Sequence, residues 1–273
     1  MTTYETIRVE HEGPVTWIVL NRPDHLNALS DVLQDELMTA LTELETSGGS
    51  VIVLRGEGRC FSAGYDIQPD NEEVAGTGGR GIIEERDRLL GNLERFLRLW
   101  DHPKPTIACV HGYCLAGATQ LAGLCDLTIV SRSAVIGEAS MPIGGGYLEP
   151  FWSTFMGPKR AKQMTFTPGG RIDGETAAAW GWANYAVDDD ALIDDVRALA
   201  TRIARIHPDV LKVRKYSVNR QFESTGFRAH ILAGAETDAL LHFADPVRDL
   251  MFDIKNLGLK AAMAKFEGEG APS

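Results

Sequence analysis

Short apolar runs separated by amphipathic stretches are the feature that most constrains the fold of this chain. The runs at 15–20, 51–54, 106–110 and 127–130 are mostly apolar along their whole length, which is typical of strands buried on both faces. After the first run, leucines recur at helical spacing, at Leu33, Leu37, Leu41 and Leu44. Ser30 or Asp31 is suited to begin that helix. Strands that alternate with helices in this way predict an α/β fold.

The flanking segments extend this pattern. We expect additional strands over 7–10 and 134–136, and helices over 117–124 and up to residue 100. From about residue 157 onward the sequence is mostly helical in character. The chain therefore divides into an α/β part and a helical part.

Composition excludes several classes of partner. The 273 residues carry a formal net charge of −11, which disfavours nucleic acid and anionic membranes as partners. The four cysteines form no CxxC pair, so neither a metal site nor a disulfide framework is expected. The N-terminal segment lacks the basic start and apolar centre of a signal peptide, and no apolar run is long enough to span a bilayer. We expect a cytoplasmic protein.

Two turns rich in small residues follow buried strands, one over 56–64 and one over 116–118. The nucleotide-binding patterns GxxxxGK[ST] and GxGxxG do not occur at either turn. Small residues leave main-chain N–H groups uncovered, and two such groups directed at one oxygen form an oxyanion hole. The helix expected to begin at Gly117 adds partial positive charge at the same point. This pairing predicts a site that stabilises a thioester carbonyl as it becomes an enolate or a tetrahedral oxyanion.

Several motifs occur in order along the chain: LNRPDHLNAL at 20–29, FSAGYDI at 61–67, KP at 104–105, GYCLAG at 112–117, CD at 125–126, RID at 171–173 and AWGWA at 179–183. Together they resemble the crotonase superfamily, which is the enoyl-CoA hydratase/isomerase family, from about residue 6 to 186. The resemblance implies a spiral of β-β-α repeats over 1–200 that holds an acyl-CoA site, and a C-terminal helical trimerisation region over 201–273. It implies a homotrimer or a dimer of trimers. The ligand implied is an acyl-CoA thioester, with coenzyme A as part of the substrate and no permanently bound cofactor.

The resemblance also assigns roles to individual positions. The oxyanion donors would be the main-chain N–H groups of Tyr65 and Gly117. Coenzyme contacts would come from Leu26, Ala28, Ala63, Gly64, Asp66, Ile67 and Gln68. Gln68 stands where many members of the family have a lysine that reaches the coenzyme phosphates. We expect Asp66 to cap the helix after its loop rather than act as a base, because Asp satisfies free N–H groups at such positions.

The family's hydratases use two glutamates to add water across a double bond, and the resemblance places Gln120 and Ser140 at those two positions. An amide has no pKa that is useful for proton transfer. The candidates for a replacement acid or base are Glu138, two residues before Ser140, and Glu149 and Tyr147 in the altered loop over 144–150.

Two hypotheses follow. The first is an acyl-CoA-transforming enzyme, an enoyl-CoA hydratase/isomerase of the lyase or isomerase type, with an intact oxyanion hole but without the two-glutamate pair. Isomerisation, thioester hydrolysis, carbon–carbon cleavage and decarboxylation all use such a hole, and the sequence does not separate them. The second is a non-catalytic acyl-CoA-binding or assembly subunit that has lost its acids.

Overall fold

The computed structural model describes residues 2–66, 79–145 and 147–268. Ile67 and Gln68, both expected to contact coenzyme, lie outside these ranges. The strands are β1 (Ile7–Glu12), β2 (Val15–Leu20), β3 (Val51–Gly56), β4 (Thr106–Val110), β5 (Tyr113–Leu115), β6 (Leu127–Ser131), β7 (Val135–Gly137), β8 (Arg171–Asp173) and β9 (Tyr185–Val187). The helices of the first part are η1 (Pro23–His25), α1 (Asp31–Leu44), α2 (Ile82–Asp101), α3 (Gly117–Gly123), α4 (Glu149–Met156), α5 (Pro158–Phe166) and α6 (Gly174–Trp180). The later helices are α7 (Leu192–Ile203), α8 (Pro208–Glu223), α9 (Phe227–His242), α10 (Asp245–Leu257) and α11 (Leu259–Phe266).

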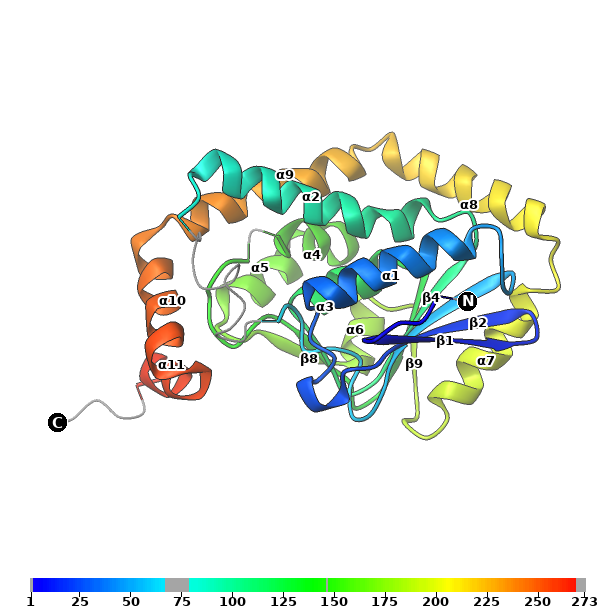
Figure 1. Cartoon of the computed structure of the whole chain (residues 1–273), viewed down its shortest axis with the longest axis horizontal. Coiled ribbons are helices and arrows are strands. Elements are labelled where there is room, and N and C mark those ends of the chain that lie inside the picture. Colours follow the sequence, from blue (N-terminus) through cyan, green and yellow to red (C-terminus); the bar gives the residue numbers. More distant parts are fainter. Residues whose placement is uncertain (1, 67–78, 146, 269–273) are drawn as a thin grey trace.

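The larger sheet has the strand order β1-β2-β3-β4-β6-β9 and is parallel except for the β1–β2 hairpin. Its apolar strands are buried on both faces, as their sequences predicted. One face packs on α7 through Val15, Val53 and Ile107, and the other packs on α1, α2 and α3 through Ile18, Leu54 and Ala108. Figure 1 shows this sheet between α7 on one side and α1 and α2 on the other.

A smaller sheet has the order β5-β7-β8 and lies beyond the carboxyl ends of β4 and β6. The chain passes from β4 to β5 to α3, and then from β6 to β7, so each of these two turns of the spiral contributes one strand to each sheet. This is the α/β spiral with a C-terminal helical region that the resemblance implied. The three-residue strand β5 was not among the expected strands.

Helix α1 begins where the sequence indicated. The Ser30 side chain accepts a hydrogen bond from the N–H of Leu33 (3.3 Å), which satisfies one of the free donors of the first turn. Helix α2 lies beside α1 and α9. Helices α10 and α11 lie at one end of the molecule and α8 lies at the other (Figure 1). None of the helices in the described ranges is long and apolar enough to cross a membrane.

Candidate active site

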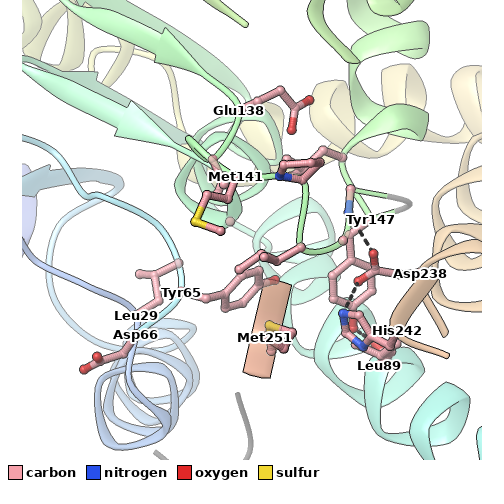
Figure 2. Close-up of a pocket in the computed structure, with 18 of the residues that line it drawn as sticks. Leu29, Tyr65, Asp66, Leu89, Glu138, Met141, Tyr147, Asp238, His242 and Met251 are labelled. Atoms are coloured by element: carbon pink, nitrogen blue, oxygen red, sulfur yellow. Dashed lines mark hydrogen bonds and ion pairs between the residues drawn. The ribbon is translucent and has the colours of Figure 1, made fainter. Parts of the chain in front are cut away.

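A cavity of about 660 Å³ opens between the spiral and the C-terminal helices. Its wall includes Tyr65 and Gly117 from the two small-residue turns, Leu89 from α2, Glu138 after β7 and Asp238 from α9. Figure 2 shows the Tyr65 ring pointing toward the side of the cavity on which Met251, Asp238 and His242 lie. The wall is therefore built by both halves of the chain.

Backbone pairing brings the two turns together. Ser62 pairs in parallel with Cys114, through hydrogen bonds from the N–H of Ser62 to Tyr113 O (3.0 Å) and from the N–H of Leu115 to Ser62 O (3.2 Å). On its other side the first turn pairs with Leu29, whose N–H donates to Gly64 O (2.8 Å). These bonds fix residues 62–66 between the end of the 22–29 loop and the start of α3.

The two backbones approach each other so closely at this point that side chains would not fit. A Cβ added to Gly64 would lie 2.6 Å from Leu115 O and 3.3 Å from the nitrogen of Gly117. A Cβ added to Gly117 would lie 2.5 Å from the Tyr65 ring. Between them, Ala116 adopts a φ of 48°, a left-handed conformation that is costly for a non-glycine residue and concentrates at functional sites.

The side chain of Gln120 lies behind Tyr65 and does not form part of the cavity wall. Its Oε1 accepts a hydrogen bond from the Tyr65 hydroxyl (2.7 Å), and its Nε2 donates to the main-chain oxygen of Tyr147 (2.9 Å). The residue is fully buried and is not among the described residues that line the cavity. The Tyr65 ring is also stacked on Phe96, with centroids 6.2 Å apart. Gln120 thus fixes the position of Tyr65.

Tyr147 lines the cavity, but its hydroxyl is bound to the main chain of α2. Its hydroxyl donates a hydrogen bond to the main-chain oxygen of Leu89, and burial raises its pKa far above the ordinary value for a phenol. Tyr65 is similar, because burial raises the pKa of its hydroxyl well above the usual range. Both phenols therefore stay protonated at neutral pH.

Glu138 lines the cavity and has the properties of a proton-transfer group. Burial raises the pKa of its carboxyl to about 7, and the nearby charges of Glu149 and Asp238 act in the same direction. Its Oε1 accepts a hydrogen bond from the Trp152 indole, and its Oε2 has no hydrogen-bond partner among the described residues. A carboxyl that titrates near neutrality can both accept and donate a proton at physiological pH.

The other predicted acid-base positions differ from Glu138. Ser140 is hydrogen-bonded by Arg171 Nη2 (2.8 Å) and is not among the described residues that line the cavity. Glu149 lines the cavity at the start of α4, and burial together with the charge of Asp238 raises its pKa, but the residue is exposed to solvent. Of the predicted acid-base positions, the structure therefore brings Glu138, Tyr147 and Glu149 to the cavity and leaves Ser140 outside its lining.

Among the residues expected to contact coenzyme, Ala63 and Asp66 line the cavity. Asp66 forms an ion pair with Arg22 (2.8 Å). Leu26 and Ala28 lie next to this region and their carbonyl oxygens are engaged, Leu26 O with the N–H of Ala63 and Ala28 O with Arg22. Gly64, between Ala63 and Asp66 in the chain, is buried.

Sequence reasoning missed a buried ionic cluster at the cavity wall. Glu85 of α2 binds Arg88 Nη2 (2.6 Å), Arg80 Nε (2.8 Å) and His242 Nδ1 (2.9 Å), and its side chain is fully buried. Asp238, one turn before His242 on α9, accepts a hydrogen bond from the N–H of Gly145 (2.9 Å), and Figure 2 shows this bond beside the Asp238–His242 contact. The i, i+4 spacing of an acid and a histidine on α9 was the only available signal.

The comparisons agree with the fold and the site. The family model described as enoyl-CoA hydratase/isomerase matches residues 10–237. A protein of Rhizobium meliloti named "Probable enoyl-CoA hydratase" is 34% identical over 82% of this chain and 84% of its own length. A hydroxycinnamoyl-CoA hydratase-lyase of Pseudomonas fluorescens is 30% identical over 82% of this chain and 83% of its own. The crystal structure of an enoyl-CoA hydratase/isomerase from Xanthobacter autotrophicus is 32% identical, with a TM-score of 0.89 over 99% of this chain and all of that one.

Fold and cavity together define a crotonase-fold enzyme. This chain belongs to the enoyl-CoA hydratase/isomerase family.

Proposed function

We propose that this enzyme transforms acyl-CoA thioesters by stabilising an enolate in an oxyanion hole formed by the main-chain N–H groups of Tyr65 and Gly117. The close approach of the 64–65 and 115–117 backbones is the observation that carries the proposal. Neither N–H has a hydrogen-bond acceptor within the described part of the chain. Gly117 is also the first residue of α3, although a helix of this length adds only a modest field. Removing one such donor typically costs about 3–4 kcal/mol of transition-state stabilisation.

We further propose that Glu138 is the general base. It would accept a proton from the carbon next to the thioester while the negative charge moves onto the carbonyl oxygen, and it would return the proton in a later step. Gln120 and Ser140 stand where the family's hydratases carry glutamates, and neither can exchange a proton near neutral pH. The paired carboxylates that deliver water to a double bond would then be absent.

A panel of acyl-CoA thioesters, with products followed by mass spectrometry, tests this function. We expect turnover of some members, together with hydration of crotonyl-CoA that is slow or undetectable. Glu138→Gln should reduce the turnover to a small residual rate, and Glu149→Gln should leave most of it. Rapid hydration of crotonyl-CoA that survives both substitutions would contradict the relocation of proton transfer to Glu138.

A further inference from the structure

A buried carboxylate of α9 binds the segment before α4, which carries Gly144, Gly145 and Tyr147. Asp238 is 4% exposed, and its Oδ1 accepts a hydrogen bond from the N–H of Gly145 (2.9 Å). The approach is close, because a Cβ added to Gly144 would lie 2.9 Å from the same oxygen. A carboxylate is costly to bury unless specific groups bind it. This contact therefore fixes one point of the segment to the C-terminal helical region.

Asp238 is itself held by its own helix and, through that helix, by α2. His242 lies one turn later on α9, with its Nε2 3.7 Å from Asp238 Oδ2 and its Nδ1 2.9 Å from Glu85 Oε1 of α2. Figure 2 shows Asp238 between His242 and the segment before α4. Glu85 also binds Arg80 and Arg88, so the carboxylate of Asp238 is attached to a fixed frame.

The segment before α4 is connected to the proposed oxyanion hole through Tyr147 and Gln120. The main-chain oxygen of Tyr147 accepts a hydrogen bond from Gln120 Nε2 (2.9 Å), and Gln120 Oε1 accepts one from the Tyr65 hydroxyl (2.7 Å). The Tyr65 ring lies against the α-carbon of Gly117, where an added Cβ would be 2.5 Å from the ring. A displacement of Tyr147 would therefore move Tyr65 relative to Gly117, and these two residues carry the proposed oxyanion donors.

We propose that Asp238 is a positioning residue for the oxyanion hole. By binding the N–H of Gly145, it holds the segment before α4 in place. The hydrogen bonds of Tyr147 and Gln120 carry that position to Tyr65. This inference rests on the proposed acyl-CoA function and adds a residue of the C-terminal helical region to the groups on which that function depends.

Two readouts test this role. One is kcat and KM for an acyl-CoA that the wild type turns over, and the other is the infrared band of the isotope-labelled thioester carbonyl in bound hexanoyl-CoA. Donors in the oxyanion hole polarise this carbonyl and lower its stretching frequency. Asp238→Leu should lower kcat about ten- to a hundredfold, as a small misplacement of reacting groups does. KM should change little, and the band should move toward its position in free hexanoyl-CoA.

Asp238→Asn is the conservative variant. Its side-chain oxygen can accept the same hydrogen bond from Gly145, so it should keep both readouts close to those of the wild type. Equal losses in Asp238→Asn and Asp238→Leu would overturn the proposal, because the charge of Asp238 and not its bond to Gly145 would then be responsible.

Gly145→Ala changes the same contact from its other end. Gly145 has a φ of 124°, a conformation that side-chain-bearing residues rarely adopt. A Cβ added there would meet no described residue beyond its chain neighbours within 4 Å. The variant should therefore shift the segment without removing a charge or a hydrogen-bonding group, and it should reproduce both effects of Asp238→Leu. It decides the question should Asp238→Leu fail to fold.

Glu236→Leu is the matched control. Glu236 is exposed on α9 and forms an ion pair with Arg86 of α2 (3.6 Å), so this variant removes a carboxylate from the same helix and should leave both readouts unchanged. The band position reports only bound thioester, so partial unfolding cannot imitate the result. An unchanged band in Asp238→Leu and Gly145→Ala would overturn the positioning role, even if kcat fell. A wild type that binds no hexanoyl-CoA, or leaves its carbonyl band at the free position, would instead overturn the proposed function itself.

Discussion

At the scale of single residues, an amide at position 120 does what a carboxylate could not. Gln120 accepts a hydrogen bond from the Tyr65 hydroxyl and donates one to the main-chain oxygen of Tyr147. A glutamate there could accept from Tyr65 but, when ionised, would face the Tyr147 carbonyl with no proton to donate. The amide is therefore matched to fixing Tyr65 beside Gly117. Proton transfer is, in our proposal, left to Glu138, whose raised pKa comes mainly from burial.

The pH dependence of turnover should report Glu138. Because its pKa is raised to about 7, a base at this position is active only above that value. We expect kcat/KM for a turned-over acyl-CoA to fall about tenfold per pH unit as the pH drops below 7. Glu149→Gln should keep this acidic limb, and the residual rate of Glu138→Gln should lack it. A rate that instead falls as the pH rises through 7 would assign Glu138 the role of an acid and contradict the proposal.

At the scale of elements, the sequence predicted those features that local patterns determine. The buried strands and α1 lie where the apolar runs and Ser30 indicated. Burial on both faces and helix capping each depend on residues that are neighbours in the sequence, so local patterns reveal them. The meeting of the two small-residue turns was inferred because each turn follows a buried strand, and the pairing of Ser62 with Cys114 brings the two turns together. The ionic partners of Glu85 and the binding of Ser140 by Arg171 could not be predicted, since they join segments far apart in the chain.

A buried lysine of helix α8 binds the end of α2 and the segment before β6. Lys215 Nζ forms an ion pair with Asp126 (2.8 Å) and donates to Leu99 O (3.1 Å), and its side chain is only 7% exposed. Leu211 is the one fully buried position of this helix. Lys215→Met should lower the free energy of unfolding by about 2–4 kcal/mol, because Asp126 is left without its buried partner. The measurement is urea denaturation.

Lys212→Met serves as the control for that prediction. Lys212 lies on the same helix and is exposed, so its loss should change stability by less than about 0.5 kcal/mol. Equal stability of the two variants would show that the ion pair does not hold α8 in place. A second variant, Asp126→Asn, should destabilise to a similar extent as Lys215→Met.

At the scale of the whole molecule, the cavity exists only because the spiral and the C-terminal helices meet. Asp238 of α9 binds Gly145 and His242 of α9 binds Glu85 of α2, so the C-terminal helical region forms part of the cavity wall. Exposed apolar side chains on α8, including Val213, Tyr216 and Val218, are suited to a subunit contact. Assembly as a trimer or a dimer of trimers stays a prediction, as does the boundary at residue 200.

The junction between α2 and α9 should make the stability of the molecule depend on pH. Burial alone would raise the pKa of the Glu85 carboxyl, but hydrogen bonds from His242 and two arginines outweigh it and hold the pKa far below the ordinary value. A lowered folded-state pKa contributes stability that is fully present above the unfolded-state value, about 4.3, and is lost as the pH falls toward the folded-state value. We expect the melting temperature of the wild type to decrease once the pH drops below about 4.5. Glu85→Gln should lower stability at pH 7 by about 3 kcal/mol, because it leaves the partly buried Arg80 and Arg88 without their anion. The same variant should lose less additional stability than the wild type between pH 5 and 3, as measured by calorimetry, since it has no carboxylate left to protonate at this position. Parallel acid profiles for the two proteins would mean that other carboxylates, and not this junction, set the response to acid.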